Sequence, residues 1–536
     1  MQEIFWDFES RSAINLKNSG SWRYAADPTT EILCLCYAIE NGDALTWLPQ
    51  WVTKQLGLPE QPVPEVFCDI AANPSEWKTV AHLAEFERSL YERILVPRHG
   101  FPPLPLEVQH CSMTLALANG YPAELDLLSQ ALELEYRKDM EGVRLMRAMS
   151  RPRKPRRGED KGTLQWMFDA EKLQRLILYC RRDVHAARAV WRHPKLKPII
   201  KSERRSQILD AVINRRGVRA DRELATAARD MAVRERSRLN AAMSALTEGT
   251  IDSIDQVQRI RGLANAHGHE MESLGKHSIA AVLAGNPSEL VRQLLELRRD
   301  GARASTKKYQ RILDSVTDDD RIRGTMRMYG AGPGRWSGHG PQLQNLKKNE
   351  NNIPLAGIEA VRSGDRDRLR AFGNPLTVLG DIARAVVCAG PGNVLMAADF
   401  GAIESRVLAW LAGEIWKLEA YREYDRSGDK TIEPYRIIAA QMLHKTARTF
   451  RRRNGTRAKL ASSPAGSAGQ WQPGDASPRT TGALTKRFGP TSLPGGKRIR
   501  RRLRTGENLH ARSVSPSAPG GRRPPAGSWR DMSRAI

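Results

Sequence analysis

The segment LMAADFGAIESRVLAWLAGE, residues 395–414, is the most informative stretch for the fold because it contains two successive hydrophobic patterns. An apolar run over 395–398 predicts a buried strand that ends on Asp399, and Gly401 predicts a tight turn after that strand. The following apolar residues have helical spacing and predict an amphipathic helix whose core-facing side is formed by Val407, Leu408, Trp410 and Leu411. Two interpretations of Asp399 stay open: a carboxylate that meets a metal ion, or an ordinary residue that caps the helix.

This segment resembles the first palm motif of family A DNA polymerases, and most closely that of the short bacteriophage-type enzymes found in phages and prophages. The resemblance implies that Asp399 binds the two catalytic magnesium ions. It also implies that Glu404 packs against the incoming sugar and disfavours a 2′-hydroxyl. The expected partners are then a DNA primer-template and dNTPs.

A second motif lies upstream, in the glycine-rich stretch 328–346, and is similar to the G-R-x-S…P-x-L-Q-N signature of the same family. An arginine fork in a minor groove can hydrogen-bond acceptors that every base pair offers, so it tests pairing geometry rather than base identity. The resemblance implies that Arg335 contacts the primer end and that Gln344 and Asn345 lie near the duplex. A plain glycine-rich surface loop is the alternative, but such a loop would not require Gln and Asn at a fixed spacing.

The N-terminal stretch IFWDFES, residues 4–10, predicts a strand on which Asp7 and Glu9 project to the same side. Two neighbouring carboxylates repel each other unless a cation lies between them. A solvated edge strand is the other interpretation, because a D-x-E pattern often occurs by chance.

Two later stretches favour the metal-binding interpretation, one carrying Glu87 and the other carrying Tyr179 and Asp183 one helical turn apart. Together with Asp7 and Glu9 they resemble, in order and spacing, the motifs of the DEDD 3′→5′ exonucleases attached to many DNA polymerases. The resemblance implies that Asp7, Glu9 and Asp183 hold metal ions and that Glu87 takes the fourth acidic place. Tyr179 would orient the attacking water.

The sequence departs from the exonuclease pattern at two positions, because Leu83 stands where Asn is usual and Glu87 where Asp is commoner. Loss of the Asn weakens binding of the DNA 3′ end but removes no metal ligand. We therefore expect an active but impaired nuclease that acts on 3′ ends of single-stranded DNA. Phosphodiester hydrolysis at neutral pH uses one cation to activate water and a second, about 3.5–4 Å away, on the departing oxygen. Carboxylate oxygens suit Mg²⁺ or Mn²⁺, so we expect two such ions per active site.

The charge of the chain favours a polyanionic partner. Its 536 residues include 85 Lys and Arg against 60 Asp and Glu, a formal net charge of +25, which suits nucleic acid, although ribosomal and membrane-surface proteins share this property. Residues 446–536 hold 20 Lys and Arg against three acids, which leaves a net +8 for residues 1–445. The body of the chain is therefore only mildly basic.

The six cysteines form no C-x-x-C pair and no cluster with zinc spacing, so we expect free thiols in a reducing compartment and no structural zinc. The N-terminus carries acids where a signal peptide would carry bases, and no apolar stretch approaches the roughly 18 residues of a membrane helix. We therefore expect a cytoplasmic, monomeric protein without a membrane partner.

These patterns predict an α/β (α+β) chain with four parts. The predicted parts are an exonuclease-like, RNase H-like domain (1–198), a linker and helical thumb (199–330), a partial polymerase palm with the start of the fingers (331–445), and a basic, disordered tail (446–536).

Two motifs that the resemblance would place after residue 445 are absent from the sequence. They are the fingers helix whose Arg and Lys contact the triphosphate, and the His-Asp-Glu hairpin that supplies the second metal carboxylate. We therefore expect a 3′→5′ exonuclease with little or no templated DNA synthesis. The tail is either an out-of-frame reading of a longer GC-rich gene or a genuine basic tail that adds salt-sensitive DNA affinity. A stand-alone magnesium exonuclease and an inactive duplex-binding protein remain alternatives.

Overall fold

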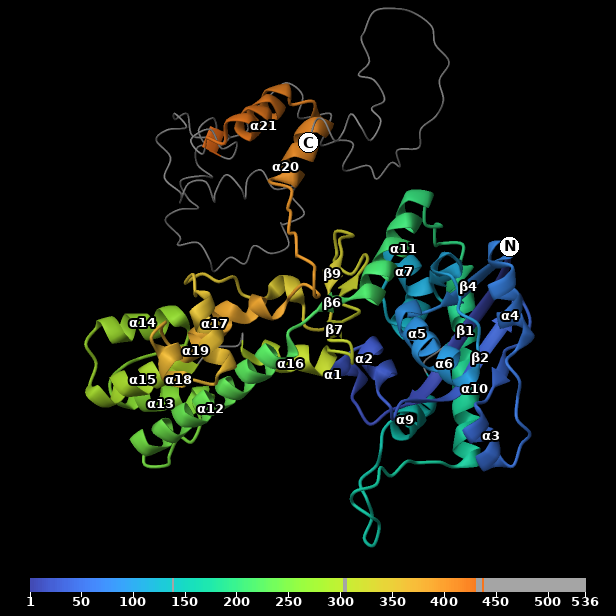
Figure 1. Cartoon of the computed structure of the whole chain (residues 1–536), viewed down its shortest axis with the longest axis horizontal. Coiled ribbons are helices and arrows are strands. Elements are labelled where there is room, and N and C mark those ends of the chain that lie inside the picture. Colours follow the sequence, from blue (N-terminus) through green and yellow to red (C-terminus); the bar gives the residue numbers. More distant parts are fainter. Residues whose placement is uncertain (137–138, 302–305, 430–435, 438–536) are drawn as a thin grey trace, which may run out of the picture. The chain divides into compact units, whose positions relative to one another are not determined.

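The computed structural model describes residues 1–136, 139–301, 306–429 and 436–437 of the chain (Figure 1). The chain divides into two compact units, Met1–Leu395 and Met396–Ile536. The predicted tail, residues 446–536, lies outside the described residues. The described part contains both helices and a mixed sheet, which confirms the predicted α/β class.

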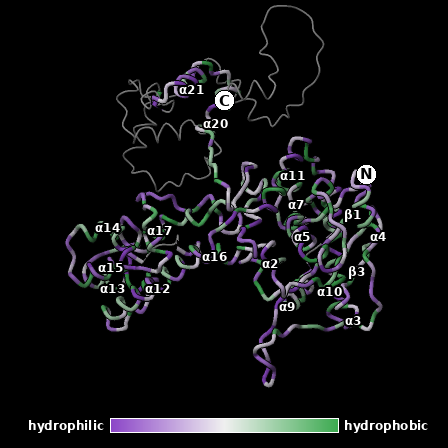
Figure 2. The backbone as a smooth tube through the Cα atoms, in the orientation of Figure 1, coloured by the Kyte–Doolittle hydropathy of each residue, from purple (hydrophilic) through white to green (hydrophobic). Residues whose placement is uncertain are grey.

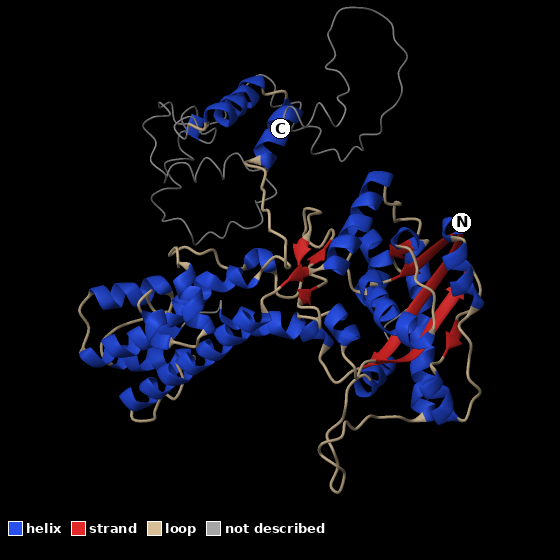
Figure 3. Cartoon of the chain, in the orientation of Figure 1, coloured by secondary structure: helices blue, strands red, loops and turns tan. Residues whose placement is uncertain are grey.

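A five-stranded sheet with the order β3-β2-β1-β4-β5 organises the first part of unit one, which we call the sheet module (Figure 3). Strand β1 pairs antiparallel with β2 and parallel with β4, so it is a central strand and the edge-strand interpretation of residues 4–10 is wrong. Strands β2 and β3 are antiparallel, and β4 and β5 are parallel. The strands are β1 (Gln2–Arg11), β2 (Glu31–Ile39), β3 (Leu45–Trp47), β4 (Trp77–Ala81) and β5 (Gln109–Cys111).

Both faces of this sheet are covered, because alternate residues of β1 enter two different cores. Ile4, Trp6 and Phe8 pack in one cluster that includes Phe67 of α4, whereas Phe5 packs on the other face in a cluster with α10. The helices of the module are α1 (Leu16–Ser19), α2 (Ser21–Ala26), α3 (Gln50–Leu56), α4 (Glu65–Ala72), α5 (Ala84–Leu90), α6 (Val96–His99), α7 (Ser112–Ala118), α8 (Leu125–Ala131), α9 (Met140–Met149) and α10 (Ala170–Trp191).

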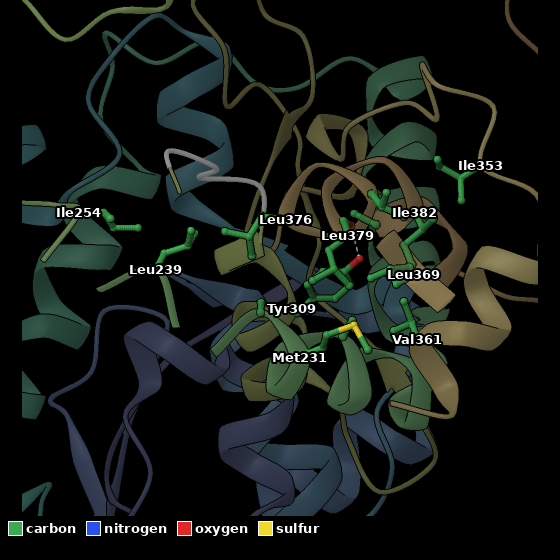
Figure 4. Packing of buried hydrophobic residues seen from close by; sticks show 14 of the residues in the cluster. Met231, Leu239, Ile254, Tyr309, Ile353, Val361, Leu369, Leu376, Leu379 and Ile382 are labelled. Atoms are coloured by element: carbon green, nitrogen blue, oxygen red, sulfur yellow. Dashed lines mark hydrogen bonds between the residues drawn. The ribbon is translucent and has the colours of Figure 1, made fainter. Parts of the chain in front are cut away.

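The rest of unit one is a helical module built around one further core (Figure 4). That core runs from Ala220 to Val386, and the buried Tyr309 hydroxyl within it donates a hydrogen bond to the Leu379 carbonyl. The core therefore crosses the predicted boundary between residues 330 and 331. The helices of the helical module are α11 (Lys201–Arg216), α12 (Arg222–Leu246), α13 (Val257–Ala266), α14 (Lys276–Ala284), α15 (Glu289–Gly301), α16 (Lys307–Ser315), α17 (Leu355–Arg362), α18 (Arg366–Arg370) and α19 (Pro375–Asp381). Two short strand pairs accompany them, β6 (Val218–Arg219) with β7 (Arg321–Ile322), and β8 (Met326–Arg327) with β9 (Ser337–Gly338).

Helix α11 contacts the sheet module of unit one through two arginines, Arg204 and Arg215, of which Arg215 pairs with Glu92 at 2.9 Å. The Arg204 guanidinium donates to the backbone carbonyls of Leu106, Glu107 and Gln109 at 3.4, 2.7 and 2.9 Å. These carbonyls lie at the start of β5 and just before it, so the helix is fixed directly to the edge of the sheet.

The helices have the hydropathy pattern of helices packed on one side. In α15 the buried residues Val291, Leu294 and Leu295 follow helical spacing, and the arginines Arg298 and Arg299 stand in the last turn. Hydrophobic and hydrophilic residues alternate in this way along the tube of Figure 2. Throughout the described part of the chain, no helix combines the length and the apolar character needed to cross a membrane.

The strand predicted for residues 395–398 is absent from the structure. These residues have no regular secondary structure, and Leu395 and Met396 are 59% and 93% exposed. A strand needs a hydrogen-bonded neighbour, and no described residue pairs with this segment. The predicted turn at Gly401 is present, and the predicted helix follows it as α20 (Ile403–Ala412), succeeded by α21 (Ile415–Ser427).

The buried side of α20 also differs from the prediction. Leu408, Trp410 and Leu411 are exposed and Val407 is half-buried, whereas the buried residues are Ser405, Arg406 and Ala409. Arg406 forms a two-bond ion pair with Asp425 of α21, both at 2.7 Å, and its guanidinium lies 4.4 Å from the Tyr421 ring centroid. This ion pair turns a polar side of α20 toward α21, which apolar periodicity could not predict.

Candidate active site

Strand β1 presents Asp7 and Glu9 on the sheet face that α10 covers. The Cys180 thiol of α10 lies 3.5 Å from the Asp7 carbonyl oxygen and 3.7 Å from its Oδ2. Glu9 is two residues further along the strand, so it projects to the same face, and only 5% of it is exposed. The strand is held in the middle of the sheet by neighbours on both sides, which gives these two carboxylates a fixed position.

Helix α10 adds Tyr179 and Asp183 from successive turns. The helix begins at an N-cap aspartate, Asp169, whose side chain accepts a hydrogen bond from the Lys172 amide at 2.9 Å. One turn separates Tyr179 from Asp183, so the tyrosine hydroxyl can donate a hydrogen bond to the Asp183 carboxylate. The charges of Asp183, Glu9 and Asp7 all act on Tyr179, whose pKa is raised chiefly by burial.

Helix α5 supplies the fourth acidic residue. Glu87 is 3% exposed, and its Oε2 has no hydrogen-bond partner among the described groups. Its charge acts on Asp7, so the two carboxyls belong to one cluster. Leu83, which replaces the usual Asn, is the N-cap residue of α5 and makes no side-chain cap bond.

Burial disfavours the ionised forms of all four acids, and repulsion by neighbouring acids adds to this effect for Asp7 and Glu9. Burial, then the charges of Asp183, Glu87 and Glu9, raises the pKa of Asp7 well above its usual value, and burial together with Asp183 does the same for Glu9. Burial raises the pKa of Glu87 to about 8 and that of Asp183 to about 6. A bound cation would reverse these shifts because it favours the charged form of each carboxyl.

The donor set fits hard divalent ions such as Mg²⁺ or Mn²⁺. Oxygen atoms from four carboxyls are available, one of them the buried Glu87 oxygen without a partner. One ligand atom each from Asp7, Glu9 and Cys180 lies within 4.8 Å of the others, while Glu87 and Asp183 are close enough to act on Asp7. A pocket of about 90 Å³ between α8, α9 and α10 is lined by Tyr179 and Asp183, so these two residues border a cavity.

The stability of the metal-free protein should fall as pH rises. A carboxyl whose folded pKa is raised stabilises the fold fully below its unfolded pKa, and this contribution is lost as pH rises through the folded pKa, about 6 for Asp183 and about 8 for Glu87. With a chelator present, we expect Tm to drop by roughly 5 °C between pH 5 and pH 9. A loss of about a few kcal/mol of unfolding free energy produces a Tm change of this size. Mg²⁺ should reverse this drop, most strongly at high pH.

Thermal melts across this pH range, with chelator and with Mg²⁺, measure the effect. Glu87→Gln serves as the matched variant, because it keeps the side-chain size and removes the group that titrates near pH 8. In this variant, the part of the Tm drop that occurs at high pH should disappear. A Tm that is independent of pH in the parent protein would contradict the raised pKa values that burial gives to Asp183 and Glu87.

The predicted primer-binding residues lie within and just after the β8–β9 hairpin. Arg335 stands in the exposed loop before β9, and Gln344 and Asn345 belong to a short 3-10 helix, Leu343–Asn345. The Gln344 side chain covers Gly338 so closely that an added Cβ there would meet its Nε2 at 1.5 Å. The two halves of the G-R-x-S…P-x-L-Q-N stretch are therefore in contact, because Gln344 of the second half packs on Gly338, which follows the first. Sequence reasoning had not singled out this glycine.

The predicted palm residues Asp399 and Glu404 lie in the second unit. Asp399 is exposed, and α20 has Ala402 as its N-cap without a side-chain cap bond, so the interpretation of Asp399 as the helix cap is wrong. Glu404 is an exposed residue of the first turn of α20. Within the described residues, Asp399 joins no group of three or more metal-ligating side chains.

Sequence reasoning missed two residues that touch the acidic cluster. Cys180 contacts Asp7, and Gly142 of α9 lies where an added Cβ would be 2.2 Å from Tyr179 Cδ2. Cys180 directly follows Tyr179 in the sequence, so its place on the covered face of α10 could have been inferred from helical spacing. Nothing in the local sequence around Gly142 indicates its contact with a tyrosine on another helix.

Comparison with known proteins gives one close relative. The DNA polymerase of Bacillus phage SP02 is 30% identical over 448 residues, which cover 82% of this chain and 65% of that protein. The chain thus spans just under two thirds of the length of this relative. A solved structure, the POL domain of Pol1 from M. smegmatis in complex with DNA primer-template and dNTP, has a TM-score of 0.48 at 16% identity over 85% of this chain and 66% of that one. No family model matches the chain.

Proposed function

Because the chain is a homologue of a phage DNA polymerase, we propose that it is a family A polymerase of the bacteriophage type whose sheet module is a 3′→5′ exonuclease. The observation that carries the exonuclease proposal is the convergence of four acidic residues from three elements in one cluster, the buried Glu9 and Glu87 and the half-buried Asp7 and Asp183. The mixed sheet with a central β1 also supports it, because this arrangement suits an RNase H-like domain. The substrates would be single-stranded 3′ ends and primer-templates of DNA.

In this proposal the protein side chains position a hydrolytic water and a phosphodiester. Asp7, Glu9 and Asp183 would hold two divalent ions, with Glu87 as the fourth acid. When bound, such ions lower the pKa of water and neutralise charge on the departing oxygen. Tyr179, whose hydroxyl can donate a hydrogen bond to Asp183, would orient the attacking water.

The polymerase half of the proposal rests on the homology and on the motif resemblance. Arg335, Gln344 and Asn345 would contact the primer-template, and Glu404 would select the sugar of a dNTP. Asp399 would bind Mg²⁺, but it is exposed and joins no group of three or more metal-ligating side chains among the described residues, which leads us to propose that this chain synthesises DNA poorly.

One assay separates this proposal from its alternatives. The full chain is incubated with a 5′-labelled primer-template and Mg²⁺, with and without dNTPs, and the products are resolved on a sequencing gel. Shortening of the primer in both reactions supports an exonuclease with deficient synthesis. Template-directed lengthening instead identifies a complete polymerase, and salt-sensitive binding without any product identifies an inactive duplex-binding protein.

Replacing Gly142 by Ala should lower the nuclease rate by about 10- to 100-fold, because a displacement of about 1 Å at a reacting group can cost that much. The new Cβ would lie 2.2 Å from Cδ2 and 2.6 Å from Cγ of Tyr179, so the ring must leave its present position. The measurement is single-turnover shortening of a labelled oligonucleotide at saturating Mg²⁺.

The matched control is Gly262→Ala in α13, where an added Cβ would meet no atom within 4 Å. Both changes replace a helical glycine, so both remove the same conformational freedom. An unchanged rate in Gly142→Ala, at the same Tm as the parent, would argue against a positioning role for Tyr179.

A further inference from the structure

Three buried cysteines form a second ligand cluster directly beside the acidic residues. Cys34 and Cys36 are alternate residues of β2, so their side chains share a face, and Cys180 lies on α10, which covers that face. One sulfur from each lies within 4.8 Å of the other two, and all three residues are 0% exposed. None of them forms a disulfide.

The sheet register ties this cluster to the acidic residues. Cys36 is the partner of Asp7 across the β1–β2 ladder, and Cys34 is the partner of Glu9, so each thiol stands beside a carboxylate on the same face. Cys180 belongs to both groups, because its sulfur is also within 4.8 Å of ligand atoms of Asp7 and Glu9. The sulfur ligands and the oxygen ligands are therefore contiguous.

The surroundings distinguish one thiol of this cluster from the other two. Burial disfavours ionisation of Cys36, but hydrogen bonds with the Cys180 and Cys34 thiols and the Thr46 hydroxyl lower its pKa below the usual value, whereas the pKa values of Cys34 and Cys180 are raised. The Thr46 hydroxyl in turn accepts a hydrogen bond from Arg181 at 2.9 Å. The thiolate is the form that binds a metal ion.

We propose that Cys34, Cys36 and Cys180 bind one thiophilic divalent cation of the zinc class, with an Asp7 carboxylate oxygen as the fourth ligand. Three sulfurs and one oxygen make the tetrahedral, soft-donor set that such an ion prefers and that Mg²⁺ does not. Three adjacent thiols could instead pack as small apolar side chains, and only metal binding distinguishes the two cases. If the proposed function holds, occupancy would take Asp7 away from the hard ions.

Titration with Co²⁺ tests the proposal on the full chain, in excess Mg²⁺ and with a phosphine reductant. One equivalent of Co²⁺ should produce the strong near-ultraviolet charge-transfer absorption of thiolate-bound cobalt, and Zn²⁺ should displace it. Cys36→Ser, which keeps the side-chain size, should weaken Co²⁺ binding by at least about 10-fold. Cys68→Ser, at an exposed thiol, should leave it unchanged.

A second readout does not depend on the absorption band. A cation that binds only the native state raises Tm, so Zn²⁺ should stabilise the parent and Cys68→Ser proteins but not Cys36→Ser or Cys180→Ser, provided that all four remain folded by circular dichroism. Absence of both the band and the Tm rise in the parent, or their persistence in Cys36→Ser, would overturn the proposal.

Failure of this inference is distinguishable from failure of the exonuclease proposal. The Co²⁺ band and the Zn²⁺-dependent Tm require no nuclease activity. In Asp7→Ala the three thiols remain, so the band should persist with weaker affinity even when hydrolysis is lost. A band that is independent of Asp7 and Cys180 would place the cobalt elsewhere and contradict the site.

Discussion

Replacing Asp7 by Asn should reduce hydrolysis of DNA 3′ ends by at least about 100-fold, the upper range seen when groups that merely support a metal ligand are removed. Asp7 lies at the centre of the cluster, where the charges of Glu9, Glu87 and Asp183 all act on its carboxyl. Asn preserves the size of the side chain but removes the charge that would hold two cations together. The measurement is the rate of primer shortening in Mg²⁺.

The same substitution should leave the fold intact or make it more stable. With a chelator present, removal of one of four crowded carboxyls relieves repulsion, so Tm should not fall. Asp252→Asn, at an exposed position in the helical module, controls for the loss of one negative charge and should keep full activity. An Asp7→Asn protein that shortens primers as fast as the parent would refute the assignment of the site.

Templated DNA synthesis by this chain should be at least about 1,000-fold slower than by a complete polymerase, because loss of even one charge-stabilising group costs about 100- to 1,000-fold. Phosphoryl transfer needs two cations between paired carboxylates and groups that hold the triphosphate. Asp399 is exposed and lies in a segment without strand pairing. It belongs to no group of three or more metal-ligating side chains among the described residues.

The measurement is primer extension in the Asp7→Asn background, in which the primer should survive. The polymerase of Bacillus phage SP02 is a suitable positive control because it is a homologue. A gel-shift assay shows that the primer-template is bound, so that failed synthesis is not mistaken for failed binding. Extension over many nucleotides at a rate near that of the control would contradict the proposed deficiency.

Local periodicity was sufficient to locate the acidic side chains on their elements. Alternation placed Asp7 and Glu9 on one side of a strand, and four-residue spacing placed Tyr179 and Asp183 on one side of a helix, as in the structure. The gathering of these elements was expected only from family resemblance. Their catalytic roles stay predictions until they are measured.

Register between strands could not be read from the sequence. Cys34 and Cys36 meet Glu9 and Asp7 only because β2 pairs with β1 in one particular alignment, which depends on residues far apart in the chain. The cysteine spacing therefore gave no sign of a ligand cluster.

The prediction for residues 395–398 was wrong for a related reason. An apolar run indicates a strand only when a neighbouring strand pairs with it, and no described residue does so. The helix that follows was predicted correctly, because a helix satisfies its own backbone hydrogen bonds.

The contact of Arg204 with three carbonyls affects how the protein can be shortened for laboratory production. A fragment that stops at residue 198 discards α11 and leaves the oxygens of Leu106, Glu107 and Gln109 without their shared donor. Recombinant versions of the sheet module should therefore extend through Arg216, so that the truncation does not damage the edge of the sheet that it is meant to isolate.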